Sequence, residues 1–327
     1  MAQVPRSAFV TGGSGFIGGR LVARLADGGS RVRALARSDS SAAAVEARGA
    51  EPVPGDLSDV ASMREGAEGC EAAFHLAAHL GTWGRREDFH RDNVTGTENA
   101  LVACRDAGVR RFVHCSTEAV LIAGEPLRNV DETAPLRPDS KALYSATKAL
   151  AERAARTASA DGFEAVILRP RFVWGRGDTT LVPGITAMID AGRFAWIDGG
   201  TQLTDTAHVD NVIEGLLLAA ERGSAGEAYF VTDGDRVVFR DFVSEMLRAQ
   251  GVEPPDRTMP AGVAGALAAA CETAWRALPL PGEPPVTRFA VWVSSQECTI
   301  DITKARRELG YEPVMARAEG LDEMRVG

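Results

Sequence analysis

The chain has 327 residues, of which 45% are hydrophobic and 25% charged, so it can bury a large core and is neither disordered nor a coiled coil. Its formal net charge of −9 argues against nucleic acid or an anionic membrane face as the main partner. The five cysteines include no CxxC pair, and such scattered thiols are typical of a reduced, cytosolic protein, so we predict a cytoplasmic location.

Short apolar runs alternate with helical patterns over the first two-fifths of the chain, which is typical of βαβ units and a parallel sheet. The expected strands are residues 7–11, 31–37, 51–55, 72–78, 111–116 and 165–169. The expected helices are residues 16–27, 58–68, 89–107 and about 140–159. We therefore predict an α/β fold with a Rossmann-type, doubly wound parallel sheet.

The pattern changes after Pro170, where Gly, Pro and Trp separate shorter elements. The expected elements are helices at residues 181–191, 209–222 and 240–250 and a strand at 228–231. This change predicts a dinucleotide-binding domain over residues 1–170. A smaller, interleaved C-terminal substrate-binding lobe covers residues 171–327, and some of its segments return to the main sheet.

The longest apolar stretch is residues 261–280, and it is interrupted by Glu272 and Arg276. This stretch is too polar to span a bilayer, so we expect a helix over a hydrophobic pocket and no integral membrane segment.

A glycine-rich turn, TGGSGFIG at residues 11–18, joins the first expected strand to its helix. Without side chains, the backbone can approach a pyrophosphate, whose charge meets the N–H groups and positive end of the helix. Two registers fit: Gly13, Gly15 and Gly18 give GxGxxG, and Gly12, Gly15 and Gly18 give GxxGxxG. The position between strand and helix predicts dinucleotide binding. The residues of the turn assigned to the cofactor are Gly12, Gly15, Phe16, Ile17 and Gly18.

The end of the second expected strand selects the cofactor, because a carboxylate there bonds the 2′-hydroxyl of NAD, whereas an Arg favours the 2′-phosphate of NADP. No carboxylate occupies this end, and Arg37 is placed to pair with a phosphate through two hydrogen bonds. We therefore favour NADP(H), with NAD(H) as the alternative if Asp39 turns back to the ribose. Four residues after the third and fourth strands complete the expected site: Asp56 and Leu57 beside the adenine, and Ala77 and Ala78 beside a cofactor ribose.

Tyr144 and Lys148 are four residues apart in an expected helix, so the phenol and the ammonium share one face and can enter one cleft. A free phenol with a pKa of about 10 is a poor acid–base catalyst at neutral pH. The Lys148 cation and the positive ring of an oxidised nicotinamide favour the phenolate, and Lys148 can also bond the ribose hydroxyls. The alternative is a surface Tyr and Lys at helical spacing.

Several motifs, in the right order over nearly the whole chain, resemble the extended short-chain dehydrogenase/reductases. They are TGGSGFIG, Asp56-Leu57, HLAA at residues 75–78, Asn93, Ser116-Thr117, YSATK at 144–148, RPRFVWG at 169–175 and HVDN at 208–211. The resemblance implies an NAD(P)-dependent enzyme that moves a hydride between nicotinamide C4 and a secondary alcohol or ketone. It also implies that Thr117 bonds the substrate oxygen, that Tyr144 gives the proton, and that Pro170 and Val173 line the nicotinamide.

Two branches of this family compete for the substrate class. Sugar-nucleotide epimerases and dehydratases often carry an Arg for the diphosphate where this chain has Thr204, although Arg171 or Arg193 can substitute. The expected pocket walls are instead apolar, which suits a hydrophobic alcohol or ketone. They are residues 80–84, 120–122, 181–184, 194, 196 and 289–292. The alternative interpretation is that these apolar residues belong to the core or to a dimer interface. The chain thus resembles the 3β-hydroxysteroid dehydrogenase/isomerase branch and, within it, the bacterial 2-alkyl-3-ketoalkanoate reductases.

A non-catalytic NADP-binding regulator is a third possibility, but such proteins usually lack the Tyr or the Lys, and both are present here. Related enzymes commonly dimerise through helices that correspond to residues 89–107 and 140–159, so the resemblance implies a homodimer. The contexts of His75, His114 and His208 favour structural imidazoles, and their spacing predicts no metal site.

Overall fold

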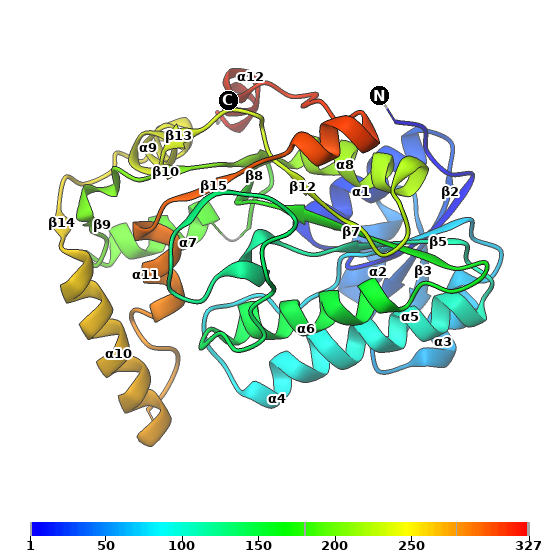
Figure 1. Cartoon of the computed structure of the whole chain (residues 1–327), viewed down its shortest axis with the longest axis horizontal. Helices are drawn as coiled ribbons and strands as arrows, with labels where there is room; N and C mark the ends of the chain where they lie inside the picture. The colour runs from blue at the N-terminus through cyan, green and yellow to red at the C-terminus, as the bar shows by residue number, and fades with distance from the viewer. Residues whose placement is uncertain (1, 180, 279, 326–327) are drawn as a thin grey trace.

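Seven parallel strands form the central sheet of the protein, in the order β12-β7-β5-β4-β1-β2-β3. The computed structural model describes residues 2–179, 181–278 and 280–325. The strands are β1 (Ser7–Thr11), β2 (Arg31–Ala36), β3 (Glu51–Pro54), β4 (Ala72–His75), β5 (Arg111–Cys115), β7 (Glu164–Pro170) and β12 (Ala228–Val231). Helices cover both faces of this sheet (Figure 1), which confirms the predicted Rossmann-type fold.

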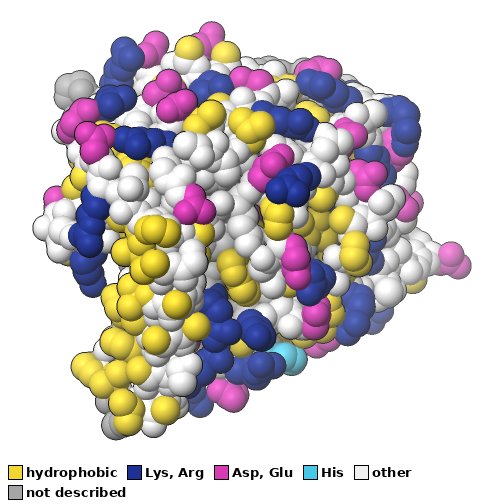
Figure 2. Space-filling model, turned by 60° about the vertical axis from the view of Figure 1, so that its left-hand side comes forward, with side chains coloured by type: hydrophobic (Ala, Val, Ile, Leu, Met, Phe, Trp, Pro, Cys, Tyr) yellow, Lys and Arg dark blue, Asp and Glu magenta, His cyan; other side chains and the backbone are white. Residues whose placement is uncertain are grey.

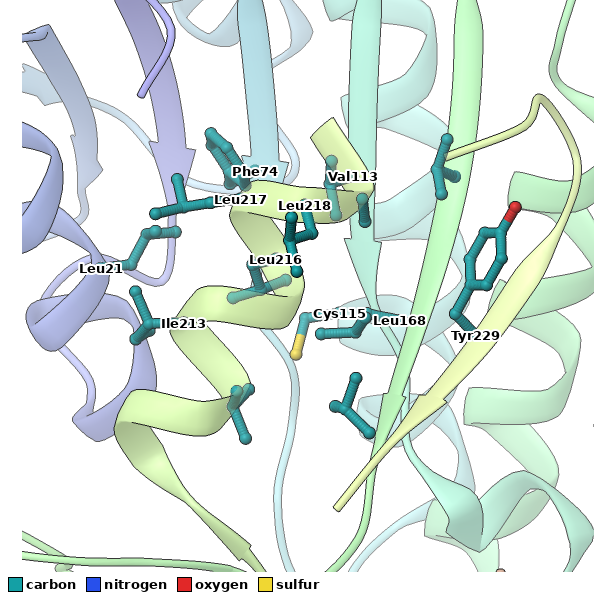
Figure 3. Close-up of a cluster of buried hydrophobic side chains, with 14 of the residues drawn as sticks. Leu21, Phe74, Val113, Cys115, Leu168, Ile213, Leu216, Leu217, Leu218 and Tyr229 are labelled. Carbon is teal, nitrogen blue, oxygen red and sulfur yellow. The ribbon is translucent and has the colours of Figure 1, made fainter. Parts of the chain in front are cut away.

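One face of the sheet packs against two helices, α1 (Phe16–Asp27) and α8 (Val209–Arg222). Figure 3 shows Leu216, Leu217 and Leu218 of α8 between Phe74 of β4 and Leu168 of β7. The other face packs against α3 (Val60–Ala67), α5 (Gly96–Asp106) and α6 (Leu143–Thr157). Because both faces are covered, the strands are almost continuously apolar, as expected for a buried parallel sheet.

Two local predictions differ from the structure. The expected helix at residues 89–107 is divided into α4 (Arg86–Phe89), a π-helical segment (His90–Thr95) and α5, and Asn93 within the π segment bonds both backbone groups of His79. Helix α2 (Asp39–Glu46) was not expected, because its polar start is a loop pattern by composition. The hydroxyls of Ser38 and Ser41 form a capping box that begins the helix there.

A second, mixed sheet joins distant segments of the chain in the order β13-β10-β15-β6. Its strands are β13 (Val237–Val238), β10 (Leu203–Thr204), β15 (Cys298–Ile300) and β6 (Leu127–Val130). Strand β6 comes from the N-terminal half, whereas β12 of the main sheet comes from the C-terminal half. The two halves of the chain therefore interleave, and strands this short carry too little alternation to be predicted.

The remaining elements lie mainly in the C-terminal half. They are η2 (Glu118–Leu121), β8 (Val173–Trp174), α7 (Leu181–Asp190), β9 (Trp196–Ile197), η3 (Asp198–Gly200), β11 (Ala207–His208), α9 (Phe239–Ala249), β14 (Thr258–Met259), α10 (Ala261–Ala277), α11 (Arg288–Ser295), η4 (Ala305–Leu309) and α12 (Arg317–Met324). Helix α10 projects from the body, and apolar side chains gather on it in Figure 2, among them the exposed Val263 and Leu267. No helix among the described residues is long and apolar enough to cross a membrane.

Candidate active site

The glycine turn between β1 and α1 is closed by a hydrogen bond of 3.0 Å from Gly15 N to Gly12 O. Gly12 has a φ of +76°, and a Cβ there would lie 2.6 Å from Ala77 N. A Cβ on Gly18 would lie 2.1 Å from Gly12 O, whereas one on Gly15 would meet nothing closer than 3.4 Å. Gly12 and Gly18 are thus required by the turn itself, and Gly15 leaves open space at the helix N-terminus. This geometry favours the GxxGxxG register and fits a dinucleotide pyrophosphate.

The residues expected near the adenosine lie at the ends of neighbouring strands. Arg37 directly follows β2 and is exposed. The Asp56 carboxylate accepts hydrogen bonds from Ser58 N and Ser58 Oγ at 2.7 and 2.6 Å, and these bonds lower the pKa of Asp56. Leu57 accepts a hydrogen bond from Asn99 at its carbonyl oxygen. Ala77 N lies 3.3 Å from Thr11 Oγ1, so the segment after β4 (Ala77 and Ala78) adjoins the glycine turn.

Three polar side chains converge near the carboxyl end of β5. Thr117 lies two residues beyond this strand, close enough to the Tyr144 phenol to influence its pKa. Lys148, 3% exposed, donates from Nζ to Cys115 O at 2.8 Å. The Phe289 ring of α11 stands edge-on to the Tyr144 ring, with centroids 5.9 Å apart. The end of β5 thus gathers a hydroxyl, a phenol and an ammonium from two segments of the chain.

The environment keeps Tyr144 protonated. Burial raises the pKa of the Tyr144 phenol, the nearby Glu118 carboxylate and Cys115 thiol act in the same direction, and Thr117 opposes them. Burial also lowers the pKa of Lys148. The phenol pKa is therefore shifted in the opposite direction to the lowering expected from Lys148. Tyr144 is an acid here rather than a phenolate.

Pro170 and Val173 lie at the carboxyl side of the sheet, next to this group. Pro170 ends β7 and pairs with Val231 of β12, and Val173 pairs with Ala207. An added Cβ on Gly177, in the loop that follows, would lie 3.9 Å from the Phe16 ring. The loop after β8 therefore approaches the beginning of α1, where the pyrophosphate is expected.

Glu118 is a site residue that sequence reasoning missed. It is 5% exposed, accepts a hydrogen bond from Thr117 Oγ1 at 2.8 Å, and pairs with the buried guanidinium of Arg171. Arg171 also donates from Nη2 to Thr204 Oγ1 at 3.1 Å. The only local signal was a lone carboxylate in the apolar run STEAVLIA at residues 116–123. Arg171 is thus held inside the protein and does not face a substrate diphosphate.

Several segments expected to wall a pocket are core instead. Val120 and Leu121 pack in the main core, and Val182 and Trp196 pack in the core of the C-terminal lobe, as the alternative interpretation held. Trp83 lies under the Arg276 guanidinium of α10 at 5.3 Å. Of the apolar candidates, Phe289 is the one with a ring contact to Tyr144 in the described part of the chain.

Comparison with known proteins agrees with this geometry. Residues 8–232 match the NAD dependent epimerase/dehydratase family. The chain belongs to this family. It is 46% identical over 317 residues to the 4-hydroxy-2-methyl-3-oxo-4-farnesyl-3,4-dihydroquinoline-1-oxide ketoreductase of Stigmatella aurantiaca, covering 97% of this chain and 95% of that protein.

Two further comparisons place this family member among the extended short-chain dehydrogenase/reductases, as predicted. It is 35% identical over 327 residues to the 2-alkyl-3-oxoalkanoate reductase of Stenotrophomonas maltophilia, covering 97% of this chain and 98% of that protein. The dTDP-glucose 4,6-dehydratase of Streptomyces venezuelae, solved with NAD, superposes with a TM-score of 0.75 at 25% identity and 97% and 95% coverage. The predicted enzyme class is confirmed: the chain is an NAD(P)-dependent oxidoreductase with a nicotinamide cofactor.

One group of possible metal ligands occurs among the described residues of this family member. Ligand atoms of His208, Asp210 and Glu323 lie within 4.8 Å of one another. The Arg20 guanidinium already pairs with this group, at 2.7 Å from Asp210 and 3.5 Å from Glu323. These residues therefore form a structural ion pair, and we assign no metal to them.

Proposed function

We propose that the protein reduces a ketone of a hydrophobic substrate, with Tyr144 as the proton donor, Lys148 as the residue that tunes it, and Thr117 as the residue that holds the substrate oxygen. The observation that carries this proposal is the convergence of these three side chains at the end of β5. When bound, the nicotinamide supplies the hydride to the carbonyl carbon. Tyr144 O–H gives its proton to the developing alkoxide, and its protonated state in this structure suits that direction.

The cofactor proposed for this reaction is NADP(H), with NAD(H) as the alternative. The open space at Gly15 and the start of α1 at Phe16 and Ile17 would hold the pyrophosphate. The exposed guanidinium of Arg37 at the end of β2 is suited to the 2′-phosphate. Asp56 and Leu57 would lie beside the adenine, and Ala77 and Ala78 beside a ribose. Lys148 would bond the hydroxyls of the nicotinamide ribose, and Pro170 and Val173 would line its ring.

The proposed substrate class is a 3-oxo compound with a long apolar group. Both reductases described above have substrates named in these terms, one a farnesyl quinoline oxide and the other a 2-alkyl-3-oxoalkanoate. The Arg171 guanidinium is buried and held by Glu118 and Thr204, so this residue is not available to a sugar diphosphate. The aromatic ring of Phe289 beside Tyr144 supports an apolar ligand.

The experiment is NADPH consumption by the full chain with a 2-alkyl-3-keto acid and with a steroid ketone, alongside a separate assay of UDP-sugar conversion by product analysis. Tyr144→Phe should keep NADPH affinity and lose at least ~100-fold in turnover, the usual contribution of a positioned acid. Tyr229→Phe is the matched control, because the Tyr229 hydroxyl bonds Glu308. Conversion of the UDP-sugar alone would refute the apolar pocket. NADPH binding without turnover of any substrate would favour the alternative that the protein is a non-catalytic NADP-binding regulator.

The organisation of the whole molecule is part of the proposal. The C-terminal lobe, residues 171–327 apart from the segments that join the main sheet, would close over the substrate of the domain formed by residues 1–170. Helices α5 and α6, which pack side by side outside the sheet, would form a homodimer interface in the cytoplasm (Figure 1). The mass of the full chain in solution can be measured by sedimentation velocity. A mass of twice the 34.6 kDa of one chain would support the dimer, and a mass of 34.6 kDa would refute it.

A further inference from the structure

An ion pair joins the projecting helix α10 to helix α11, which carries Phe289. Glu272, the carboxylate that interrupts the apolar stretch of residues 261–280, is buried. Its Oε1 accepts a hydrogen bond from Arg288 N at 2.7 Å, and its Oε2 accepts one from Arg288 Nε at 2.8 Å. A buried carboxylate is stable only when it is paired and hydrogen-bonded, and Arg288 satisfies both oxygen atoms of this one. Glu272 thus holds the main chain of Arg288 as well as its side chain.

The two ends of α11 have different partners. At its last turn, Ser294 O accepts a hydrogen bond of 2.6 Å from Gln202 Nε2, which lies between η3 and β10. At its first turn, the two bonds from Arg288 lead to Glu272 on α10 instead. Phe289 follows Arg288 directly and lies in that first turn. The position of Phe289 therefore depends on α10.

Helix α10 is itself held at both ends, so it can support α11. At its beginning, Ala261 N donates to Asp198 Oδ1 at 2.7 Å. Near its end, the Arg276 guanidinium lies over the Trp83 ring at 5.3 Å. A small apolar cluster joins the two helices between these points, and its buried members are Ala264, Ala268 and Val291.

The side chain that this arrangement places lies beside the proposed catalytic group. Phe289 is partly exposed, and its ring stands edge-on to the Tyr144 ring with the centroids 5.9 Å apart. A partly exposed aromatic ring offers apolar contact to a ligand that binds next to it. Apolar groups that flank the substrate carbonyl would lie against this ring.

We infer that Glu272 is a positioning residue for substrate recognition: it holds the first turn of α11 through Arg288 and so keeps Phe289 against the apolar groups that flank the substrate carbonyl. This inference rests on the proposed function, because it takes Tyr144 as the place of the reaction. Glu272 acts through Phe289 and needs no contact with the substrate. Its effect should therefore appear in KM for the ketone and not in kcat.

The kinetic test measures KM and kcat for a 2-alkyl-3-keto acid in the full chain with Glu272→Ala, with Phe289→Ala and with both changes. Loss of a hydrogen bond to a charged group lowers the population of the held position roughly tenfold, and KM rises as that population falls. We expect Glu272→Ala to raise KM by about this factor and to leave kcat unchanged. If Glu272 acts through Phe289, the double variant has the KM of Phe289→Ala. Additive effects on KM, or a loss of kcat with KM unchanged, overturn the inference.

Two further variants separate positioning from general damage to the fold. Glu272→Gln keeps an acceptor oxygen for Arg288 N but cannot also accept from Arg288 Nε, so its KM should lie between those of the wild type and Glu272→Ala. It also preserves the side-chain volume, so it serves in both tests if Glu272→Ala does not fold. Glu253→Ala breaks the exposed Arg248–Glu253 pair elsewhere in the C-terminal lobe and should leave KM unchanged. If Glu253→Ala raises KM as much as Glu272→Ala does, Glu272 has no specific role.

The position of Phe289 can also be followed without turnover, by NMR of the full chain with 13C-labelled tyrosine rings. The sequence has three tyrosines, Tyr144, Tyr229 and Tyr311, and Tyr144→Phe assigns the signal of Tyr144. An aromatic ring shifts the signals of a ring that it contacts, so Phe289→Ala shows where the Tyr144 signal lies without this contact. In Glu272→Ala the Tyr144 signal should move from its wild-type position toward its position in Phe289→Ala. A signal that stays at the wild-type position refutes the role of Glu272.

The two measurements distinguish this inference from the proposed function. If the Tyr144 signal moves in Glu272→Ala but the protein reduces no ketone, the proposed function fails and the positioning of Phe289 by Glu272 stands. If ketones are reduced and Tyr144→Phe is inactive, but neither the Tyr144 signal nor KM responds to Glu272→Ala, the inference fails and the proposed function stands.

Discussion

The substitution Gly15→Ala separates the two tasks of the glycine turn, which are to fold and to leave space for a ligand. Gly15 has a φ of −78° and a ψ of −179°, which any residue adopts, and an added Cβ would meet Gly12 O at an ordinary 3.4 Å. Gly15 is the N-cap of α1, where alanine costs about 1 kcal/mol relative to the favoured residues. The variant should therefore fold, with at most about that loss in the free energy of unfolding.

The same methyl group would occupy the path of the pyrophosphate. Hydrogen bonds from backbone N–H groups to a charged group contribute about 1.5–3 kcal/mol each. Loss of one such bond raises the Kd for NADPH by roughly 10- to 100-fold, since a tenfold change corresponds to about 1.4 kcal/mol. The assay is a fluorescence titration with NADPH alongside urea unfolding of the free protein.

Gly18→Ala is the matched control, because its Cβ would lie 2.1 Å from the backbone oxygen of Gly12. We expect it to lose about 1–3 kcal/mol or more of stability, as overpacked sites do. Wild-type NADPH affinity in Gly15→Ala would show that the turn does not bind the cofactor. Equal destabilisation of Gly15→Ala and Gly18→Ala would refute the claim that the turn has room for a side chain at Gly15.

Three further predictions follow from single residues. Arg37→Ala should raise the Kd for NADPH about tenfold and leave the Kd for NADH unchanged. The control, Arg105→Ala on α5, should change neither Kd. Equal effects of Arg37→Ala on both cofactors would show that Arg37 does not bind the 2′-phosphate. Burial lowers the pKa of His75 to about 3. In the unfolded chain this imidazole takes up a proton at about pH 6.5, whereas in the folded protein it stays neutral until about pH 3. The free energy of unfolding therefore falls as pH decreases from 6.5 toward 3, by at most ~1.4 kcal/mol per pH unit for this residue. Urea unfolding at several pH values should show a shallower fall for His75→Gln, and equal slopes would contradict this assignment. Phe289→Ala should raise KM for an apolar ketone with little change in kcat, and an unchanged KM would place Phe289 outside the substrate site.

The sequence alone determined the elements whose pattern is long and local. Helices α1 and α8 and strands β1 and β12 have the predicted bounds. The glycine turn was recognisable because its residues lie within eight positions of one another. Tyr144 and Lys148 were recognised for the same reason, since helical spacing relates neighbours along the chain.

Only the tertiary structure decided which apolar segments are core and how the active-site charges pair. Val120 and Trp196 have the side chains of a pocket wall and pack in cores instead. Glu118 meets Arg171 across 53 positions of sequence. Strands β6 and β15, from opposite halves of the chain, meet in one small sheet. A buried group is satisfied by whichever partner the fold brings to it, and local sequence patterns carry no information about partners that far away.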